Sequence, residues 1–390
     1  MQRVGKRHAK TRFAGNHQRT DVVKLVDSPQ RDLLTLSDID LTETNNMKII
    51  PTLAFLCVAF GAGPQLSFSR AAADSPRMIG RVETMQPGLN KFLASDAKAE
   101  VLANGFTWTE GPLWVPPGAN VTGCDSESGC LLFSDIPRNT IFRWTPGRGI
   151  DTFLTPSGYT GTAYYGGEPG SNGLALNSNG QLTMCEHGDR RLSVLSMDGG
   201  KETLVDRFEG KRLNSPNDLV FDRSRNVYFT DPPYGMPGGE SDARRELKHC
   251  GVYRLSTEGE LTLLTTELVR PNGIGLSPDQ KSLYIAQSDG QRPVVVAFNI
   301  DADGKLGPLR ELVNAKSFQD KLPGAFDGMT VHSDGTLFCS GPGGIYVITP
   351  DGDLLGRLIT GGRVSNCTFD QNEEWLYITA DKELCRIQME

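Results

Sequence analysis

Short apolar segments, many alternating with polar residues, recur along residues 99–390 and are separated by turns rich in Gly, Asp and Asn. This pattern predicts short β-strands, since no segment of comparable length has helical periodicity. One unit repeats: a polar residue, a four- or five-residue strand, a turn, and a second strand rich in Leu, Tyr or Phe. Its copies span residues 171–187, 215–231, 271–288, 326–341 and 365–380.

The polar residues that open these units are spaced like the blades of a repeat protein. They are Asn172, Asn217, Asn272, Asp327 and Asn366, with steps of 45, 55, 55 and 39 residues, and Glu110 opens a sixth candidate unit. Two further strands follow within a unit, for example at 251–257 and 261–268. Six four-stranded units predict a β-propeller, in which radial repetition removes long open sheet edges. An open solenoid or a two-sheet sandwich is the alternative.

The last unit has only three strand segments, NCTF, WLYITA and LCRIQ. We expect residues 99–108 to supply its outer strand, because AEVLANGFTW resembles the outer-strand segment KETLVDRFEG at 201–210. The predicted fold is therefore an all-β, six-bladed β-propeller over residues 99–390. An N-terminal strand that joins the C-terminal blade closes its ring, and residues 74–98 form a linker.

The first 73 residues lack the strand pattern. Residues 1–46 are polar, basic at first and acidic later, a composition typical of disorder. Residues 47–73 begin with Met-Lys, continue as an apolar run and end in three alanines, which predicts a secretory signal peptide. We interpret 1–46 as a misassigned or disordered extension. A membrane anchor or a core helix is the alternative, although glycines and a proline interrupt the run.

The net charge of the chain restricts the kinds of molecule that it is expected to bind. The chain has a formal net charge of −7, and residues 1–73 hold ten Lys or Arg and six Asp or Glu, so their removal would leave about −11. We expect an acidic periplasmic or extracellular protein with no membrane attachment after signal cleavage. Nucleic-acid binding is disfavoured, because phosphate contacts need a basic face.

Seven cysteines follow residue 73, which leaves at least one unpaired. Cys124 and Cys130, in GCDSESGC, are candidates for a local disulfide in an oxidising compartment. The sequence has no Cys-x-x-Cys pair, which argues against a structural zinc site.

In a propeller the innermost strand of each blade lines the central channel, so the polar residues that open the six units converge at one mouth. One such residue alone is typical of a turn. Six oxygen-bearing side chains at one depth need partners, and the carboxylates of Glu110 and Asp327 need a cation. We expect Ca²⁺, completed by amide oxygens. Mg²⁺ and Mn²⁺ are other candidates, and Zn²⁺ suits the ring less because it lacks Cys and His.

The second strand of each unit returns to the same mouth. Of the three histidines after residue 73, only His187 is expected there, as a proton carrier, a substrate hydrogen-bond donor or a structural histidine. The residues expected around the ring from these second strands are Asp135, His187, Asp231, Tyr234, Ser288 and Ser340.

The motifs EGPLW, SNGLAL, CEHGDRR, SPNDLVFD, DPPYG, RPNGIGLSPD and FDGM occur in this order. Together they resemble the gluconolactonase family, relatives of regucalcin (the senescence marker protein), over about residues 100–390. The resemblance implies a six-bladed propeller with one catalytic divalent metal, usually calcium, at the channel mouth. It also implies the hydrolysis of a small-molecule substrate, a sugar lactone.

Carried over residue by residue, the resemblance assigns the metal ligands to Glu110, Asn217, Asn272 and Asp327. In some relatives the Asn of the SPND motif contacts substrate, so Asn217 is a candidate for both roles. Asp327 is also the candidate base that takes a proton from the attacking water. The other candidates are His187 as a catalytic and substrate-binding residue, and Asn172 and Tyr234 as substrate-binding residues.

Two other functions fit the same ring. Relatives hydrolyse phosphorus esters or fluorides, so an organophosphate or aryl ester hydrolase is one alternative. The other is a secreted binding propeller without enzymatic activity, whose calcium is structural.

Overall fold

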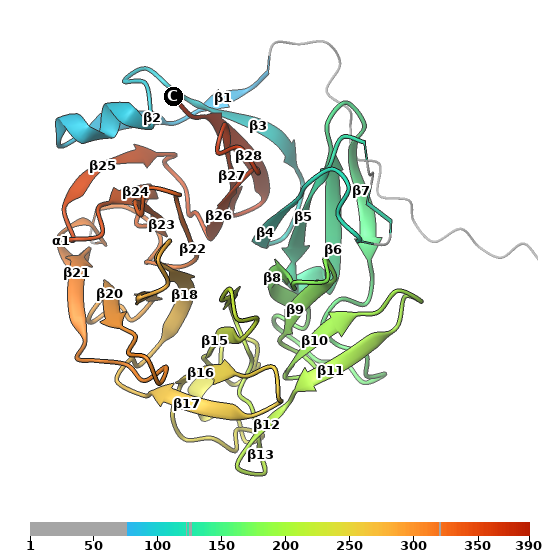
Figure 1. The fold of residues 1–390 in the computed structure, drawn as a ribbon. Helices are drawn as coiled ribbons and strands as arrows, with labels where there is room; N and C mark the ends of the chain where they lie inside the picture. The colour runs from blue at the N-terminus through green and yellow to red at the C-terminus, as the bar shows by residue number, and fades with distance from the viewer. Residues whose placement is uncertain (1–75, 122, 125–126, 320) are drawn as a thin grey trace, which may run out of the picture. The chain divides into compact units, whose positions relative to one another are not determined.

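A computed structural model describes residues 76–121, 123–124, 127–319 and 321–390. In these residues six antiparallel sheets surround a central axis (Figure 1). The predicted all-β, six-bladed propeller is therefore confirmed. The proposed extension and signal peptide at 1–73 lie outside the described residues. Within the described part, no helix has both the length and the apolar character needed to cross a membrane.

Each of the first three blades has four strands in sequence order from the axis outward, and a separate two-stranded hairpin lies between the second and third. Blade 1 comprises β4 (Thr109–Val115), β5 (Cys130–Asp135), β6 (Thr140–Thr145) and β7 (Gly149–Leu154). Blade 2 comprises β8 (Ser171–Leu176), β9 (Leu182–Glu186), β10 (Arg191–Leu195) and β11 (Lys201–Val205). The hairpin is β12 (Arg207–Phe208) and β13 (Lys211–Arg212), and blade 3 comprises β14 (Leu219–Phe221), β15 (Val227–Asp231), β16 (Gly251–Leu255) and β17 (Leu261–Thr265).

The remaining blades continue the ring and take in the N-terminal strands. Blade 4 comprises β18 (Pro271–Leu276), β19 (Ser282–Gln287), β20 (Val294–Asn299) and β21 (Arg310–Asn314). Blade 5 comprises β22 (Met329–Val331), β23 (Leu337–Gly341), β24 (Gly344–Ile348), β25 (Leu354–Ile359) and the added β2 (Arg81–Thr84). Blade 6 comprises β26 (Asn366–Phe369), β27 (Trp375–Ala380), β28 (Glu383–Gln388), β3 (Ala99–Asn104) and the added β1 (Met78–Ile79). The helical turns are η1 (Pro87–Lys91), η2 (Ile136–Arg138), η3 (Gly239–Ser241) and α1 (Lys316–Gln319).

The two ends of the described chain close the ring. Strand β3 pairs antiparallel with β28, with Val101 opposite Cys385 and Ala103 opposite Leu384, as the sequence predicted. The segment expected to be a linker contributes more than a connection, because β1 extends blade 6 and β2 extends blade 5. After β2, Leu89 in η1 and Phe92 just beyond it are buried against blades 5 and 6. The outermost strands of blades 5 and 6 are thus the short β2 and β1, and short edge strands limit pairing with other chains.

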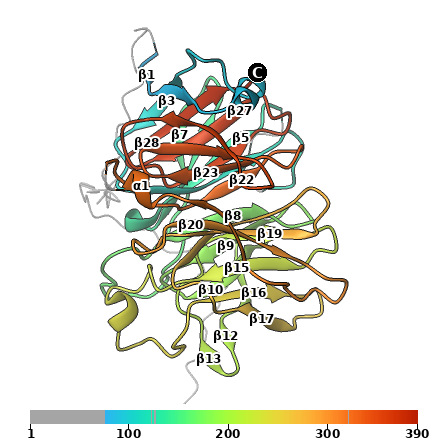
Figure 2. The ribbon, with the colours of Figure 1, turned by 90° about the vertical axis from the view of Figure 1, so that its left-hand side faces the viewer.

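Apolar side chains form six clusters, and each cluster lies between two neighbouring blades. In the side view, strands of blades 6 and 5, β27 and β23, lie above strands of blades 4 and 3, β20 and β16 (Figure 2). Middle strands such as β24 are buried on both faces, which explains their nearly continuous apolar sequence. Burial of each large apolar side chain contributes about 1.5–3 kcal/mol, so the ring is a firm support for the residues at its axis.

The candidate disulfide residues lie at the start of β5 and in the segment before it. Cys124 and Cys130 are both free thiols in the structure, and they are hydrogen-bonded to each other. This contact lowers the pKa of Cys124, while burial and the nearby Arg143 have smaller effects. The predicted proximity is confirmed, and a covalent bond is not formed.

Candidate active site

Five of the six predicted ring residues line one cavity of about 230 Å³ at the end of the channel where the inner strands begin. Glu110, Asn172 and Asn272 are each the second residue of their strands, β4, β8 and β18. Asn217 and Asp327 each lie two residues before their strands, β14 and β22. The inner strands therefore bring together side chains that are far apart in the sequence.

Close packing of the inner strands explains why glycine follows most of the ring residues. A Cβ atom on Gly111 would lie 2.0 Å from the Asn172 carbonyl oxygen, and one on Gly273 would lie 2.3 Å from that of Asp327. The Gly273 N–H instead donates to the Asp327 carbonyl at 3.0 Å. A larger side chain would push neighbouring blades apart, so these glycines hold the ring residues at one depth.

Two carboxylates dominate the electrostatics of the cavity. Burial raises the pKa of Glu110 well above its usual value, and the charge of Asp327 raises it further. Burial also raises the pKa of Asp327, with further contributions from the charges of Glu168 and Asp218. The Oδ1 atom of Asp327 is buried and has no hydrogen-bond partner among the described residues. Two such groups are costly to ionise together unless a cation is present.

The donor set fits a hard cation. Carboxylate and amide oxygens are typical ligands of Ca²⁺. Asn272 donates its Nδ2 hydrogen to Ser288 Oγ at 3.0 Å, which leaves its amide oxygen available. In the described part of the chain, no three His, Cys, Asp or Glu side chains are grouped to hold a metal. A metal in this cavity would therefore depend on the asparagine amides as well as on Glu110 and Asp327.

His187, a candidate catalytic residue, lies behind the cavity wall and not in it. Its side chain is fully buried, and its Nε2 atom is 3.3 Å from Asn172 Nδ2. Among the described residues its Nδ1 atom has no hydrogen-bond partner, and it lies 3.9 Å from Glu168 Oε2. Burial lowers the pKa of His187 to about 4, so the imidazole is neutral near pH 7. This position suits a residue that orients the Asn172 amide.

Tyr234 and Ser288 line the cavity, as expected for residues at the ends of second strands. Burial raises the pKa of the Tyr234 hydroxyl, which lies beside Ser288. The tyrosine therefore stays protonated and can donate a hydrogen bond to a ligand.

Glu168, which no sequence pattern indicated, lines the cavity from the loop between β7 and β8. Burial raises its pKa to about 7. Three more unpredicted residues, Trp108, Ile136 and Ala325, supply the apolar part of the wall. None of these residues opens or closes a repeated strand, so the repeat pattern gave no signal for them.

Asn366 is a correction. Asn366 opens β26, but its side chain does not line this cavity. It lines the channel on the far side of the ring residues, together with Asp218. Its Oδ1 accepts a hydrogen bond from the Cys367 N–H at 2.8 Å, and its amide also contacts the Asp218 carboxyl group. Asn366 is the first residue of its strand, whereas the other five are either second or two residues before theirs. Its side chain packs against Gly328, where a Cβ atom would lie 1.9 Å from Asn366 Cγ.

Three further residues expected at the mouth have structural roles. Asp135 accepts hydrogen bonds from the Thr107 and Trp108 N–H groups at 2.9 and 3.2 Å. Asp231 accepts one from the Asn214 N–H at 2.7 Å, and Ser340 donates to backbone carbonyls. They fix the loops around the cavity and do not line it.

Comparison with known proteins agrees with the fold. The model of the SMP-30/gluconolactonase/LRE-like region matches residues 108–382. A gluconolactonase of Zymomonas mobilis is 38% identical over 318 residues, which are 80% of this chain and 86% of that protein. The solved structure of a gluconolactonase from Xanthomonas campestris superposes with a TM-score of 0.68 and 31% identity, over 82% of this chain and 99% of that one.

A more distant relative acts on a different bond. The diisopropyl-fluorophosphatase of Loligo vulgaris is 26% identical over 48% of this chain and 60% of that protein. The match to the family model covers most of the propeller, and the relatives with the higher identities are gluconolactonases. The chain belongs to the SMP-30/gluconolactonase/LRE-like family.

Proposed function

We propose that this protein hydrolyses a sugar lactone to the open aldonic acid, with a divalent cation, Ca²⁺, held by Glu110, Asn217, Asn272 and Asp327. The observation that carries the proposal is the pair of buried carboxylates at the mouth, one with an unpartnered oxygen, in a chain 38% identical to a gluconolactonase. When bound, the cation would offset the two negative charges and act as a Lewis acid toward an oxygen ligand.

The residues of the chain support each step of lactone opening. Asp327 Oδ1 has no hydrogen-bond partner in the described part of the chain, so it can accept a proton from water as the water oxygen attacks the carbonyl carbon. The ring C–O bond then breaks, and the same proton passes from Asp327 to the departing ring oxygen. The acid product finally loses a proton to solvent.

Other residues orient the lactone and restrict water. The Asn172 amide and the Tyr234 hydroxyl line the cavity and can hydrogen-bond sugar hydroxyls. Asn217 has a position that suits contact with either the cation or the substrate. Trp108 and Ile136 supply an apolar wall that limits solvent around the reacting carbonyl. Neutral His187, which contacts Asn172 and not the cavity, would fix the amide orientation.

A substrate panel tests the proposal. Aldonolactones, aryl esters and a phosphofluoridate are assayed with the same protein, with and without a chelator, and after addition of Ca²⁺, Mg²⁺, Mn²⁺ or Zn²⁺. We expect aldonolactones to be opened fastest and Ca²⁺ to restore the chelated protein. Faster turnover of the phosphofluoridate or aryl esters would favour the organophosphate or aryl ester hydrolase. Calcium binding with no turnover of any substrate would favour a binding propeller.

A further inference from the structure

A second cavity, of about 400 Å³, adjoins the proposed active site. We call it the tyrosine cavity, because Tyr159, Tyr164 and Tyr165 line it from the loop between β7 and β8. Consecutive residues form a wall that the two cavities share: Ile136 and Glu168 line the active site, and their neighbours Pro137 and Pro169 line the tyrosine cavity. The tyrosines are therefore placed to contact a ligand that extends out of the active site over this wall, past Glu168.

The loop that carries the tyrosines is held firmly on one side by Asn139. The Asn139 Oδ1 atom accepts hydrogen bonds from the backbone N–H groups of Ser157, Gly158 and Tyr159, at 3.1, 2.7 and 3.1 Å. Its Nδ2 atom donates to the Tyr159 carbonyl at 2.8 Å. Three consecutive backbone donors on one side chain fix the start of the loop without burying the aromatic rings.

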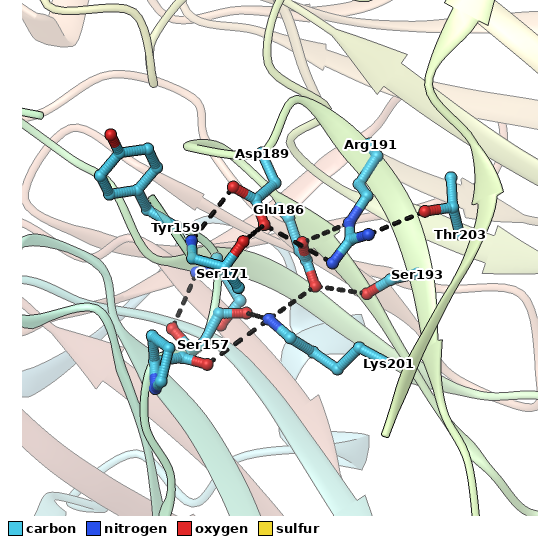
Figure 3. Close-up of polar contacts among 12 residues, drawn as sticks. Ser157, Tyr159, Ser171, Glu186, Asp189, Arg191, Ser193, Lys201 and Thr203 are labelled. Carbon is cyan, nitrogen blue, oxygen red and sulfur yellow. Dashed lines mark hydrogen bonds and ion pairs between the residues drawn. The ribbon is translucent and has the colours of Figure 1, made fainter. Parts of the chain in front are cut away.

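Blade 2 holds the same loop from the other side. The Thr160 N–H and hydroxyl donate to the Asp189 carboxylate at 3.1 and 2.7 Å. Lys201 donates to the Ser157 carbonyl at 3.0 Å and forms an ion pair with the fully buried Glu186. Figure 3 shows this network, with the Tyr159 ring pointing away from it. The polar contacts therefore position the ring without covering it.

The three aromatic rings differ in exposure in a way that suits a binding platform. The Tyr159 and Tyr165 ring centroids are 4.7 Å apart, and the Arg244 guanidinium lies 5.0 Å from the Tyr165 ring centre. Tyr165 also donates to the His187 carbonyl at 3.4 Å, which connects the platform to the active-site wall. Tyr164 is 97% exposed. One exposed ring beside two supported rings leaves an aromatic face open to a ligand.

We propose that the tyrosine cavity binds a second sugar unit, and that the preferred substrate is an aldonolactone that carries a further glycosyl group. This inference rests on the proposed lactonase function. The active-site cavity, at about 230 Å³, is smaller than the roughly 300–1,000 Å³ of pockets for drug-sized ligands and suits a single small ring. A tyrosine offers an apolar face for the C–H surface of a pyranose and a hydroxyl for its polar edge.

Specificity constants measure how much the tyrosine cavity contributes to the preference for a glycosylated lactone. We compare kcat/KM for a hexonolactone with kcat/KM for the same lactone bearing a glucosyl unit, in the wild type and in Tyr164→Ala. The ratio of glucosylated to simple lactone should fall roughly 3- to 10-fold in Tyr164→Ala. Tyr164→Phe keeps the ring and should retain most of the preference. Met85→Ala, at a residue that follows β2 on the outer edge of blade 5 and is 42% exposed, is the surface control and should leave the ratio unchanged.

A direct binding measurement separates this inference from the lactonase proposal. Cellobiose is titrated into the wild type and Tyr164→Ala by calorimetry. If both lactones are opened and the ratio is the same in Tyr164→Ala and the wild type, the second subsite is wrong and the lactonase proposal stands. If neither lactone is opened, the lactonase proposal fails, and the cellobiose titration then tests the second subsite by itself. Cellobiose binding that is at least threefold weaker in Tyr164→Ala than in the wild type supports the second subsite. The absence of cellobiose binding to the wild type overturns it.

Discussion

Glu110 and Asp327 are costly residues for the fold to place at the axis. Each carboxyl group is buried at the axis. Burial is the largest cause of the raised pKa of each group, and neighbouring charges raise it further. A carboxylate removed from water without a partner destabilises a protein by several kcal/mol unless it is neutralised. The proposed cation would neutralise both groups in the one cavity, and this gives opposite predictions for the metal-free and metal-loaded protein.

Glu110→Gln should raise the melting temperature of the chelated protein, because it removes one of the two buried acids. The same change should weaken calcium affinity by at least roughly 10- to 100-fold, the range produced even by supporting residues of a metal site. Thermal unfolding across a calcium titration measures both effects, since a ligand of the folded state raises the melting temperature by mass action. Unchanged calcium affinity in Glu110→Gln would remove Glu110 from the site.

His187→Gln distinguishes a positioning residue from a proton carrier. Because burial holds the pKa of His187 near 4, the imidazole is neutral above that pH and its titration should not shape activity between pH 6 and 8, a window about 2 units or more above it. We expect a fall in kcat/KM of roughly tenfold, with an unchanged pH profile in this window. A fall of roughly 10²- to 10⁴-fold together with the loss of one limb of the profile would instead make His187 the general acid or base.

At the scale of elements, the inner strands could be predicted from the sequence because each has a polar residue at or near its start, before a short apolar segment. A glycine follows this residue in four of the six units, where the close approach of the next blade requires it. Glu168 carries no such signal, since it lies in a loop whose course depends on hydrogen bonds to Asn139 and Asp189. Strands β1 and β2 were missed because segments of two and four residues are too short to show alternation.

Strand β3 tests the closure of the ring. Replacing Ala99–Asn104 by a Gly-Ser segment of equal length would weaken the pairing at the outer edge of β28 and leave the fully buried Ala99 site empty. We expect a melting temperature lower by roughly 5 °C or more, with a greater tendency to aggregate. The same replacement of β1, Met78–Ile79, is the control and should have a smaller effect, because β1 pairs only with the outer side of β3. Equal stability of the two variants would contradict the closure.

At the scale of the whole molecule, the described propeller accounts for residues 76–390, and the location of the protein depends on the residues before it. We propose export to the periplasm or the extracellular space, from the Met-Lys start, apolar run and alanine-rich end of residues 47–73. The expected mature N-terminus lies near Asp74. N-terminal sequencing of protein from the native host checks this, and routine recovery of residues 1–46 would rule the proposal out.

The most direct test of the account measures lactone ring opening by proton release, corrected for spontaneous hydrolysis, in the wild type and Asp327→Asn. The wild type should lose activity with a chelator and regain it with calcium. Asp327→Asn keeps an oxygen ligand but lacks the proposed base, so turnover should be roughly 10²- to 10⁴-fold lower even at saturating calcium. A wild type indifferent to chelation, or an Asp327→Asn variant with full turnover once calcium is added, would contradict the proposed mechanism.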